Sequence, residues 1–243
     1  GTAIVVTSGK GGTGKTSITG GVAGSLARLG HSVLCIDMDI GLRNLDISLG
    51  LSDRALMDFS DVAEGRCPLV RAAVNHPDLP GLALLTAPMT LSPALTEEAV
   101  RRMLDTARSL YDYVLIDSPA GLGAGFRMAC CGADRAIVVS TNDASSLRDA
   151  QRTVGELDFL RQIHLVMNRI QPKLLRQLRT TIDDAMDTAG LPLLGVVPED
   201  PQVMLSANLG RPLILGGRQG AANACLNIAK RLEGRRVPIM RIR

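Results

Sequence analysis

The sequence predicts a three-layer α/β fold, in which helices cover both faces of a mostly parallel central sheet. Two observations lead to this prediction. Short apolar runs rich in β-branched residues alternate with longer amphipathic segments from one end of the chain to the other, and such alternation is typical of parallel strands joined by helices. Most of the runs are also continuously apolar, as strands buried on both faces are.

The expected elements follow from these runs. Strands are expected at residues 3–8, 32–37, 82–87, 113–117, 136–140, 163–168 and 193–198, and helices at 17–30, 96–110 and 145–160. In the last helix Leu147, Val154 and Leu157 recur at helical spacing. Ser146 and Asp149 have the spacing of a capping box at its start. No repeat or long linker divides the chain, so we expect one domain over residues 1–243.

Composition narrows the classes of function. Hydrophobic residues make up 46% and charged residues 21% of the 243 residues, as in ordinary soluble domains. Aromatic residues make up only 2%, which argues against stacking platforms for single-stranded nucleic acid. The net charge of +3 is too small to indicate a polyanion partner, so nucleic acid is not an expected partner. No apolar stretch reaches the ~18 residues of a membrane-spanning helix.

The cysteines and the start of the chain indicate a cytosolic protein. The five cysteines show no C-x-x-C spacing. The adjacent Cys130 and Cys131 are expected to be buried, reduced thiols rather than a metal or redox site. The opening residues have the pattern of a strand and not of a signal peptide.

A glycine-rich loop, "SGKGGTGKTS", follows the first strand. Gly9, Gly14, Lys15 and Thr16 satisfy G-x-x-x-x-G-K-[ST] between a strand and a helix, which predicts a P-loop NTPase fold. Backbone N–H groups of such a loop point at phosphate oxygens, and the helix N-terminus adds its positive dipole end. Lys15 is expected to reach the β- and γ-phosphates, and the Thr16 hydroxyl to bind Mg²⁺.

Acidic residues stand at the ends of two other strands. "YVLID" ends at Asp117, and "SVLCID" ends at Asp37, with Asp39 two residues later. Ligands of open α/β sheets bind at the carboxyl ends of the strands, so we expect these carboxylates to lie close to Lys15.

At this point the sequence resembles a known family. "KGGTGKT", with a second lysine at Lys10, looks like the deviant Walker motif of the MinD/ParA class, and "DMDIGLRNLD" and "IDSPAG" narrow the resemblance to the MinD family of septum-site-determining ATPases. The similarity extends to about Pro238. Three related groups are expected to differ from this sequence. ParA-type partition proteins are expected to have Asp-Pro-Gln after the second strand, and flagellar-number relatives are expected to have Ala in place of Arg43. Iron–sulfur carriers of the Mrp type are expected to have a C-x-x-C, which this sequence lacks.

The resemblance implies ATP and Mg²⁺ as cofactors and roles for particular residues. Lys10 is expected to reach the phosphates of the partner subunit in a two-fold dimer, Asp39 to polarise the attacking water, and Gly121 to sense the γ-phosphate. Asp117 is expected to hold Mg²⁺ through a water, with Asp37 supporting its shell. The expected nucleotide contacts are Gly11, Gly12, Thr13, Gly14, Lys15, Thr16, Ser17 and Gly121 around the phosphates, and Asn168, Pro198 and Asp200 around the adenine.

The resemblance also implies partners. It implies an ATP-dependent homodimer that binds a MinC-like inhibitor and a MinE-like activator, and a location in the cytoplasm and on the inner face of the cell membrane in the ATP state. The helix from Ser145 is expected to expose Arg148, Asp149, Arg152 and Glu156, as a partner surface or simply as a solvated face.

The end of the sequence departs from the family pattern. MinD proteins usually bind the membrane through a C-terminal amphipathic helix, which we expect to begin where "GRRVPIMRIR" stands. This stretch has four arginines and Pro238, so it is not itself expected to form an interfacial helix.

Two other functions remain open on the sequence. One is DNA partition or cargo positioning of the ParA kind, for which ATP-dependent, salt-sensitive DNA binding is the test. The other is a nucleotide-binding scaffold without turnover, which the intact Lys10, Asp39 and Asp117 disfavour.

Overall fold

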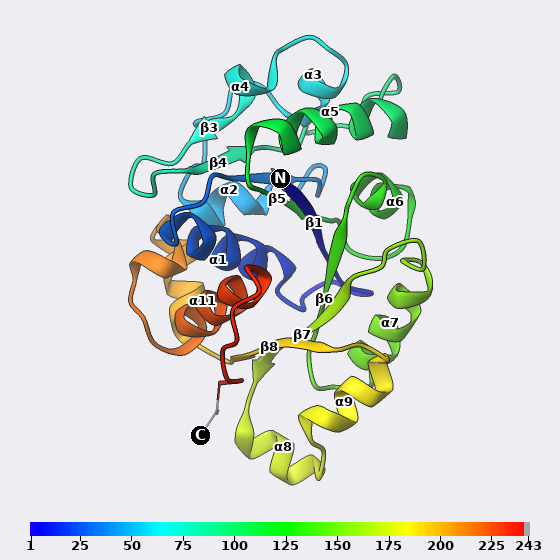
Figure 1. The fold of residues 1–243 in the computed structure, drawn as a ribbon, viewed down its shortest axis with the longest axis vertical. Helices are drawn as coiled ribbons and strands as arrows, with labels where there is room; N and C mark the ends of the chain where they lie inside the picture. Colours follow the sequence, from blue (N-terminus) through cyan, green and yellow to red (C-terminus); the bar gives the residue numbers. More distant parts are fainter. Residues whose placement is uncertain (241–243) are drawn as a thin grey trace.

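An eight-stranded sheet runs through the computed structural model, which describes residues 1–240 (Figure 1). The strand order is β3-β4-β2-β5-β1-β6-β7-β8, and every pairing is parallel except that of β3 with β4. The strands are β1 (Thr2–Thr7), β2 (Val33–Asp37), β3 (Val74–Asn75), β4 (Leu82–Leu85), β5 (Tyr113–Asp117), β6 (Arg135–Ser140), β7 (Ile163–Ile170) and β8 (Leu193–Pro198).

Helices cover both faces of this sheet. On one face lie α1 (Lys15–Arg28), α2 (Asn44–Leu49), α10 (Pro201–Asn208), a 3₁₀ turn (Leu213–Leu215) and α11 (Gly220–Leu232). On the other lie α3 (Phe59–Ala63), α4 (Leu69–Ala72), α5 (Glu97–Leu110), α6 (Ala124–Cys130), α7 (Ala144–Gly155) and α9 (Ile182–Ala189). A further short helix, α8 (Pro172–Leu178), has no buried residue. The predicted three-layer P-loop fold is confirmed.

The core lies in two clusters, one on each face of the sheet, because successive side chains of a strand point to opposite sides. In β1, Ala3 and Val5 belong to one cluster, whereas Ile4 and Val6 belong to the other. All four are fully buried, which explains why the strands are continuously apolar in sequence.

The order in which successive strands are added to the sheet reverses at β1. Strand β1 pairs with β5 on one side and with β6 on the other, so the loop after β1 lies at a topological switch point, where α/β sheets bind ligands. In the register, Asp117 lies opposite both Val6 of β1 and Asp37 of β2. The carboxyl ends of these strands therefore bring the predicted acidic residues together.

Two details differ from the sequence-based expectations. The two-residue strand β3 is too short to give an apolar run, and it was not expected. Helix α7 begins at Ala144 and ends at Gly155, and the capping box of Ser146 with Asp149 is wrong. Asp143 caps the helix instead, because its carboxylate accepts the backbone N–H of Ser146.

The tail after α11 has no helix over residues 235–240, and residues 241–243 of this stretch lie outside the described residues. Within residues 1–240, none of the helices combines the length and the apolarity needed to cross a bilayer.

Candidate nucleotide-binding site

The phosphate loop depends on three glycines for different reasons. Gly12 and Gly14 have φ of 82° and 91°, values that residues with a Cβ rarely adopt. Gly9 is needed because of a neighbour, since a Cβ there would lie 2.4 Å from the backbone oxygen of Asp149 in α7. The loop is thus held tightly against α7.

Two buried polar side chains of the loop lack a partner for their polar group within the described residues. Lys15 is 8% exposed, and burial lowers its pKa while the carboxylates of Asp117 and Asp39 raise it. Thr13 is 2% exposed, and its Oγ1 has no hydrogen-bond partner within the described residues. Buried polar groups are nearly always paired, so both side chains fit a loop that closes around an anion.

Asp117 is held by hydroxyl groups of α1. Its Oδ1 accepts a hydrogen bond from Thr19 Oγ1 at 3.1 Å, and Thr16 also donates to its carboxylate. Burial raises the pKa of Asp117 to about 7, and the Thr16 hydrogen bond opposes this rise. Thr16 and Thr19 are one helical turn apart, so both face β5 from the same side of α1.

Asp37 positions the loop that carries Asp39. Its Oδ1 accepts the backbone N–H of Asp39 at 2.9 Å, and its Oδ2 accepts that of Leu45 at 3.1 Å. Burial raises the pKa of Asp37 to about 6 against these two hydrogen bonds. Asp39 itself is half-buried, with a pKa raised by burial and lowered by Lys15.

These residues fit Mg²⁺ bound together with a nucleotide. No group of three or more His, Cys, Asp or Glu side chains that could enclose a metal occurs in residues 1–240. Mg²⁺ usually keeps several waters and takes one or two carboxylates together with substrate phosphates. Asp117 and the Thr16 hydroxyl, with Asp37 beside them in the register, form such a partial set of ligands.

A pocket of about 420 Å³ lies beside the phosphate loop. Among the predicted nucleotide contacts, those that line it are Gly14, Ser17, Asn168, Pro198 and Asp200. Its other walls include the apolar Ile18, Val203, Met204 and Leu213, which suits a flat, apolar base. The predicted phosphate contacts Gly11, Gly12 and Thr13 lie on the adjoining loop, and Thr16 lies in the first turn of α1.

Asn168 and Asp200 are already engaged with the protein. Asn168 Nδ2 donates to the carbonyl of Thr13 at 2.8 Å, which leaves its carbonyl oxygen and its second N–H to contact a base. Asp200 accepts the backbone N–H groups of Gln202 and Ala221. It therefore holds the starts of α10 and α11 around the pocket.

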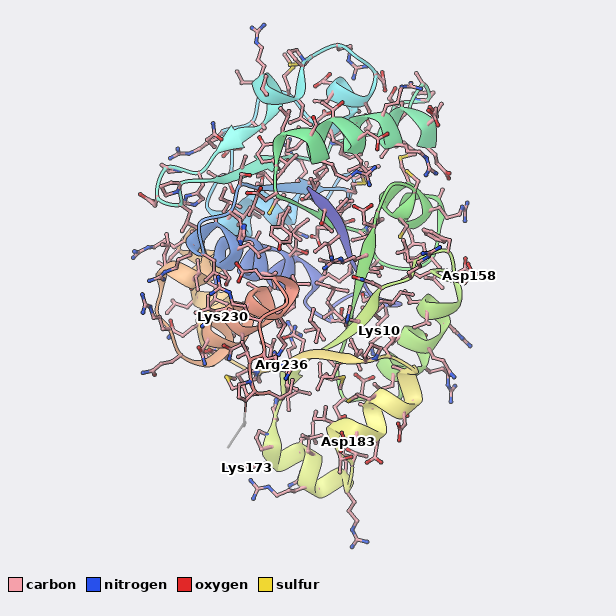
Figure 2. All side chains as sticks on the ribbon, in the orientation of Figure 1. Lys10, Asp158, Lys173, Asp183, Lys230 and Arg236 are labelled. Atoms are coloured by element: carbon pink, nitrogen blue, oxygen red, sulfur yellow. The ribbon has the colours of Figure 1, made fainter. Side chains whose placement is uncertain are left out.

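Lys10 contacts the start of α7 in its own chain. Its Nζ donates to Asp143 Oδ1 at 3.0 Å and to Ser145 Oγ at 2.9 Å, and Figure 2 shows it between the sheet and α7. The two side chains of the ion pair are 37% and 50% exposed. Burial raises the pKa of Asp143, but hydrogen bonds from Thr141, Ser145 and Ser146 outweigh this and lower it.

Gly121 lies in the loop after β5 with φ of 83° and open space around it, as a loop near the phosphates requires. Sequence reasoning missed Asp143 and Thr19. The signal for Asp143 was its position three residues before Ser146, and for Thr19 its position three residues after Thr16.

The chain is similar to known proteins over nearly its whole length. Residues 4–213 match the family model of the CobQ/CobB/MinD/ParA nucleotide binding domain. Over 242 residues the chain is 40% identical to the septum site-determining protein MinD of Synechocystis sp., covering 98% of this chain and 91% of that protein.

Two solved structures extend the comparison. The MinC:MinD cell division protein complex of Aquifex aeolicus superimposes with a TM-score of 0.92 at 36% identity, covering 99% of both chains. The septum site-determining protein MinD of Pyrococcus horikoshii, complexed with Mg-ADP, gives a TM-score of 0.84 at 27% identity and covers 96% of both chains.

Proposed function

Because the chain belongs to the MinD family of septum-site-determining proteins, we propose that it is an ATP-dependent switch that positions the bacterial division site. The main support for the proposal is one arrangement. Two lysines of one loop, Lys10 and Lys15, lie at the same end of the sheet as carboxylates that end two neighbouring strands. This arrangement suits a nucleotide whose hydrolysis is controlled.

The site would bind MgATP. The relative from P. horikoshii contains Mg-ADP, and the loop of this chain has the buried Lys15 and unpaired Thr13 hydroxyl that phosphates would satisfy. Bound Mg²⁺ would neutralise phosphate charge as it develops. Thr16 and Asp117 would hold it, and Thr19 would keep the Asp117 carboxylate in place.

Hydrolysis to ADP and phosphate requires a positioned water and added positive charge. Asp39 would polarise the water, since it lies on a loop that Asp37 holds by two backbone hydrogen bonds. Lys10 would supply charge to the phosphates of a partner subunit, as an arginine finger does. In this structure Lys10 is bound to Asp143 of its own chain, so it would have to leave Asp143 when an ATP-bound homodimer forms.

Partner proteins would bind near the same place. The A. aeolicus relative is solved in a complex with MinC, which supports a MinC-like partner here. Helix α7 exposes Arg148 and Arg152, whereas Asp149 is half-buried against Gly9. A MinC-like inhibitor or MinE-like activator on this face would lie close to Asp143 and therefore to Lys10.

We also propose that the protein cycles between the cytoplasm and the inner face of the cell membrane. In this cycle the ATP-bound dimer would use a C-terminal amphipathic helix following the present sequence. A single such helix binds marginally, and two helices on a dimer bind far more tightly.

Light scattering and phosphate release in MgATP test the switch. Lys10→Ala is expected to abolish hydrolysis and to prevent the ATP-bound dimer, whereas Asp39→Ala is expected to leave a dimer that persists in ATP. Dimers in ADP are expected for neither protein. A wild-type protein that hydrolyses ATP as a strict monomer would refute the proposal.

A further inference from the structure

A basic hollow lies at the amino ends of β6, β7 and β8, that is, at the end of the sheet opposite the phosphate loop. It has a volume of about 480 Å³. The basic side chains that line it are those of Arg135, Arg161, His164 and Arg231. The same hollow reaches Glu233 and Gly234 at the end of α11.

The carboxylates near this hollow already have basic partners. Asp134 pairs with Arg108 at 2.9 Å, and Glu233 pairs with His31 and with Arg235. Among the ion pairs of residues 1–240, none therefore neutralises Arg135 or Arg161. Their guanidinium groups are left to bind an anion.

Arg231 has a different task at the same edge. Its guanidinium donates to the backbone oxygens of Leu194, Val237 and Pro238. This ties the tail after α11 to the start of β8. The tail adds the exposed Arg236 to the basic surface, whereas Arg235 beside it is paired with Glu233. In Figure 2, Arg236 lies on this tail and Lys230 on the helix before it.

One exposed apolar side chain lies close to Arg161 in the sequence, and another lies on the tail that Arg231 holds. Phe159 is 58% exposed two residues before Arg161, and Ile239 is 42% exposed on the tail that Arg231 holds. Basic side chains next to exposed apolar ones are typical of surfaces that rest on an anionic bilayer, where the apolar groups enter the interfacial region. A DNA backbone would use the arginines but would gain nothing from Phe159 and Ile239.

We propose that this surface at the amino ends of the strands, formed by Arg135, Arg161 and the basic tail, binds the phosphate groups of anionic phospholipids. The folded body itself would then contact the membrane. The contact is additional to the C-terminal anchor proposed above. It needs neither ATP nor a dimer, because the surface lies at the opposite edge of the sheet from the nucleotide. It also does not depend on the proposed switch, whose test is hydrolysis.

Vesicle co-sedimentation at low salt without nucleotide tests this surface. Vesicles of phosphatidylcholine with phosphatidylglycerol in equal parts are expected to bind the present chain weakly, and vesicles of phosphatidylcholine alone to bind it much less. Each basic residue near an anionic surface contributes a factor of about five in binding, so Arg135→Gln with Arg161→Gln is expected to reduce partition roughly 25-fold. Added salt should abolish the binding of the wild type.

The matched control is Arg54→Gln with Arg71→Gln, which removes the same charge from two exposed positions outside the hollow, one in the loop after α2 and one in α4. It is expected to bind vesicles like the wild type. Unchanged MgATP affinity of both double variants would show that they are folded.

Several results would overturn the proposal. Equal losses in the two double variants would mean a response to net charge alone. Binding of free glycerol phosphate as strong as that of vesicles would indicate a soluble ligand, and tight, Arg135-dependent binding of duplex DNA would indicate nucleic acid. Equal binding to both kinds of vesicle would also contradict it.

Discussion

Lys15 is a buried cation whose charge no ion pair of residues 1–240 neutralises. Lys15→Ala is expected to remove measurable MgATP binding, because phosphate charge inside the loop would no longer be matched. Calorimetric titration measures this directly. Lys173→Ala, at an exposed position on α8, is the control and should keep its affinity. Affinity of Lys15→Ala within a few-fold of the wild type would mean that the loop is not the binding site.

In the proposed dimer, the pair of Lys10 with Asp143 would set a small barrier to dimerisation. Asp143→Asn keeps an oxygen for the N-cap of α7 but removes the charge that holds Lys10. Exposed ion pairs contribute about 0–1 kcal/mol each, and a two-fold dimer would break two of them, so we expect ATP-dependent dimerisation to become tighter by up to roughly 25-fold. Light scattering over a range of protein concentrations measures the change. A weaker dimer would show that Asp143 has a direct role in the assembled state.

The site residues that sequence could predict are those with a local pattern. Gly14, Lys15 and Thr16 belong to one motif, and Asp117 ends an apolar run. The partners of these residues could not be predicted in the same way. Thr19 meets Asp117 across 98 residues, and Lys10 meets Asp143 across 133. Such pairs depend on which strands the fold places side by side.

At the scale of elements, the parallel strands were predictable because both faces of the sheet are covered. Strand β5 matches its expected range 113–117, and β8 matches 193–198. The start of α7 could not be predicted in this way, because "TNDASS" offers several residues able to cap a helix. Asp143 does so because its carboxylate also receives the hydroxyls of Thr141 and Ser146.

His76 joins the β3–β4 turn to α2. Its Nδ1 accepts the backbone N–H groups of Asp78 and Leu79, and its Nε2 lies 3.0 Å from the Leu49 oxygen. Burial lowers the pKa of His76. The unfolded chain therefore binds this proton more readily, and stability should fall as the pH drops through the ordinary histidine pKa of about 6.5.

Thermal unfolding at about pH 7.5 and pH 5.5 tests this link. His76→Gln is expected to be less stable than the wild type at both pH values, with a smaller loss between them. His164, whose pKa burial also lowers, should supply part of the remaining dependence. A pH dependence as large in His76→Gln as in the wild type would show that His76 does not contribute to it.

At the scale of the whole molecule, the two edges of the sheet have different chemistry. The carboxyl ends of the strands bring Lys15, Asp39 and Asp117 together at the phosphate loop, and the pocket that Gly14 and Ser17 line adjoins that loop. The amino edge carries Arg135, Arg161 and the basic tail. In the proposed cycle, a nucleotide at the carboxyl ends of the strands would therefore change the assembly of the protein without blocking a membrane contact at their amino ends.

This separation predicts two kinds of membrane binding. The present sequence ends in "RRVPIMRIR", where Pro238 disfavours a continuous helix and few apolar residues are available. At near-physiological salt it should bind anionic vesicles weakly or not at all, even with MgATP, because arginine contacts are screened. A version extended by the amphipathic helix that the MinD family carries should bind strongly, and only with ATP, because a dimer presents two helices. Co-sedimentation of both proteins at that salt, with ATP and with ADP, measures the difference. Strong, salt-resistant, ATP-dependent binding by the present sequence would place the anchor within residues 1–243, and no gain from the extension would place the function of this protein away from the membrane.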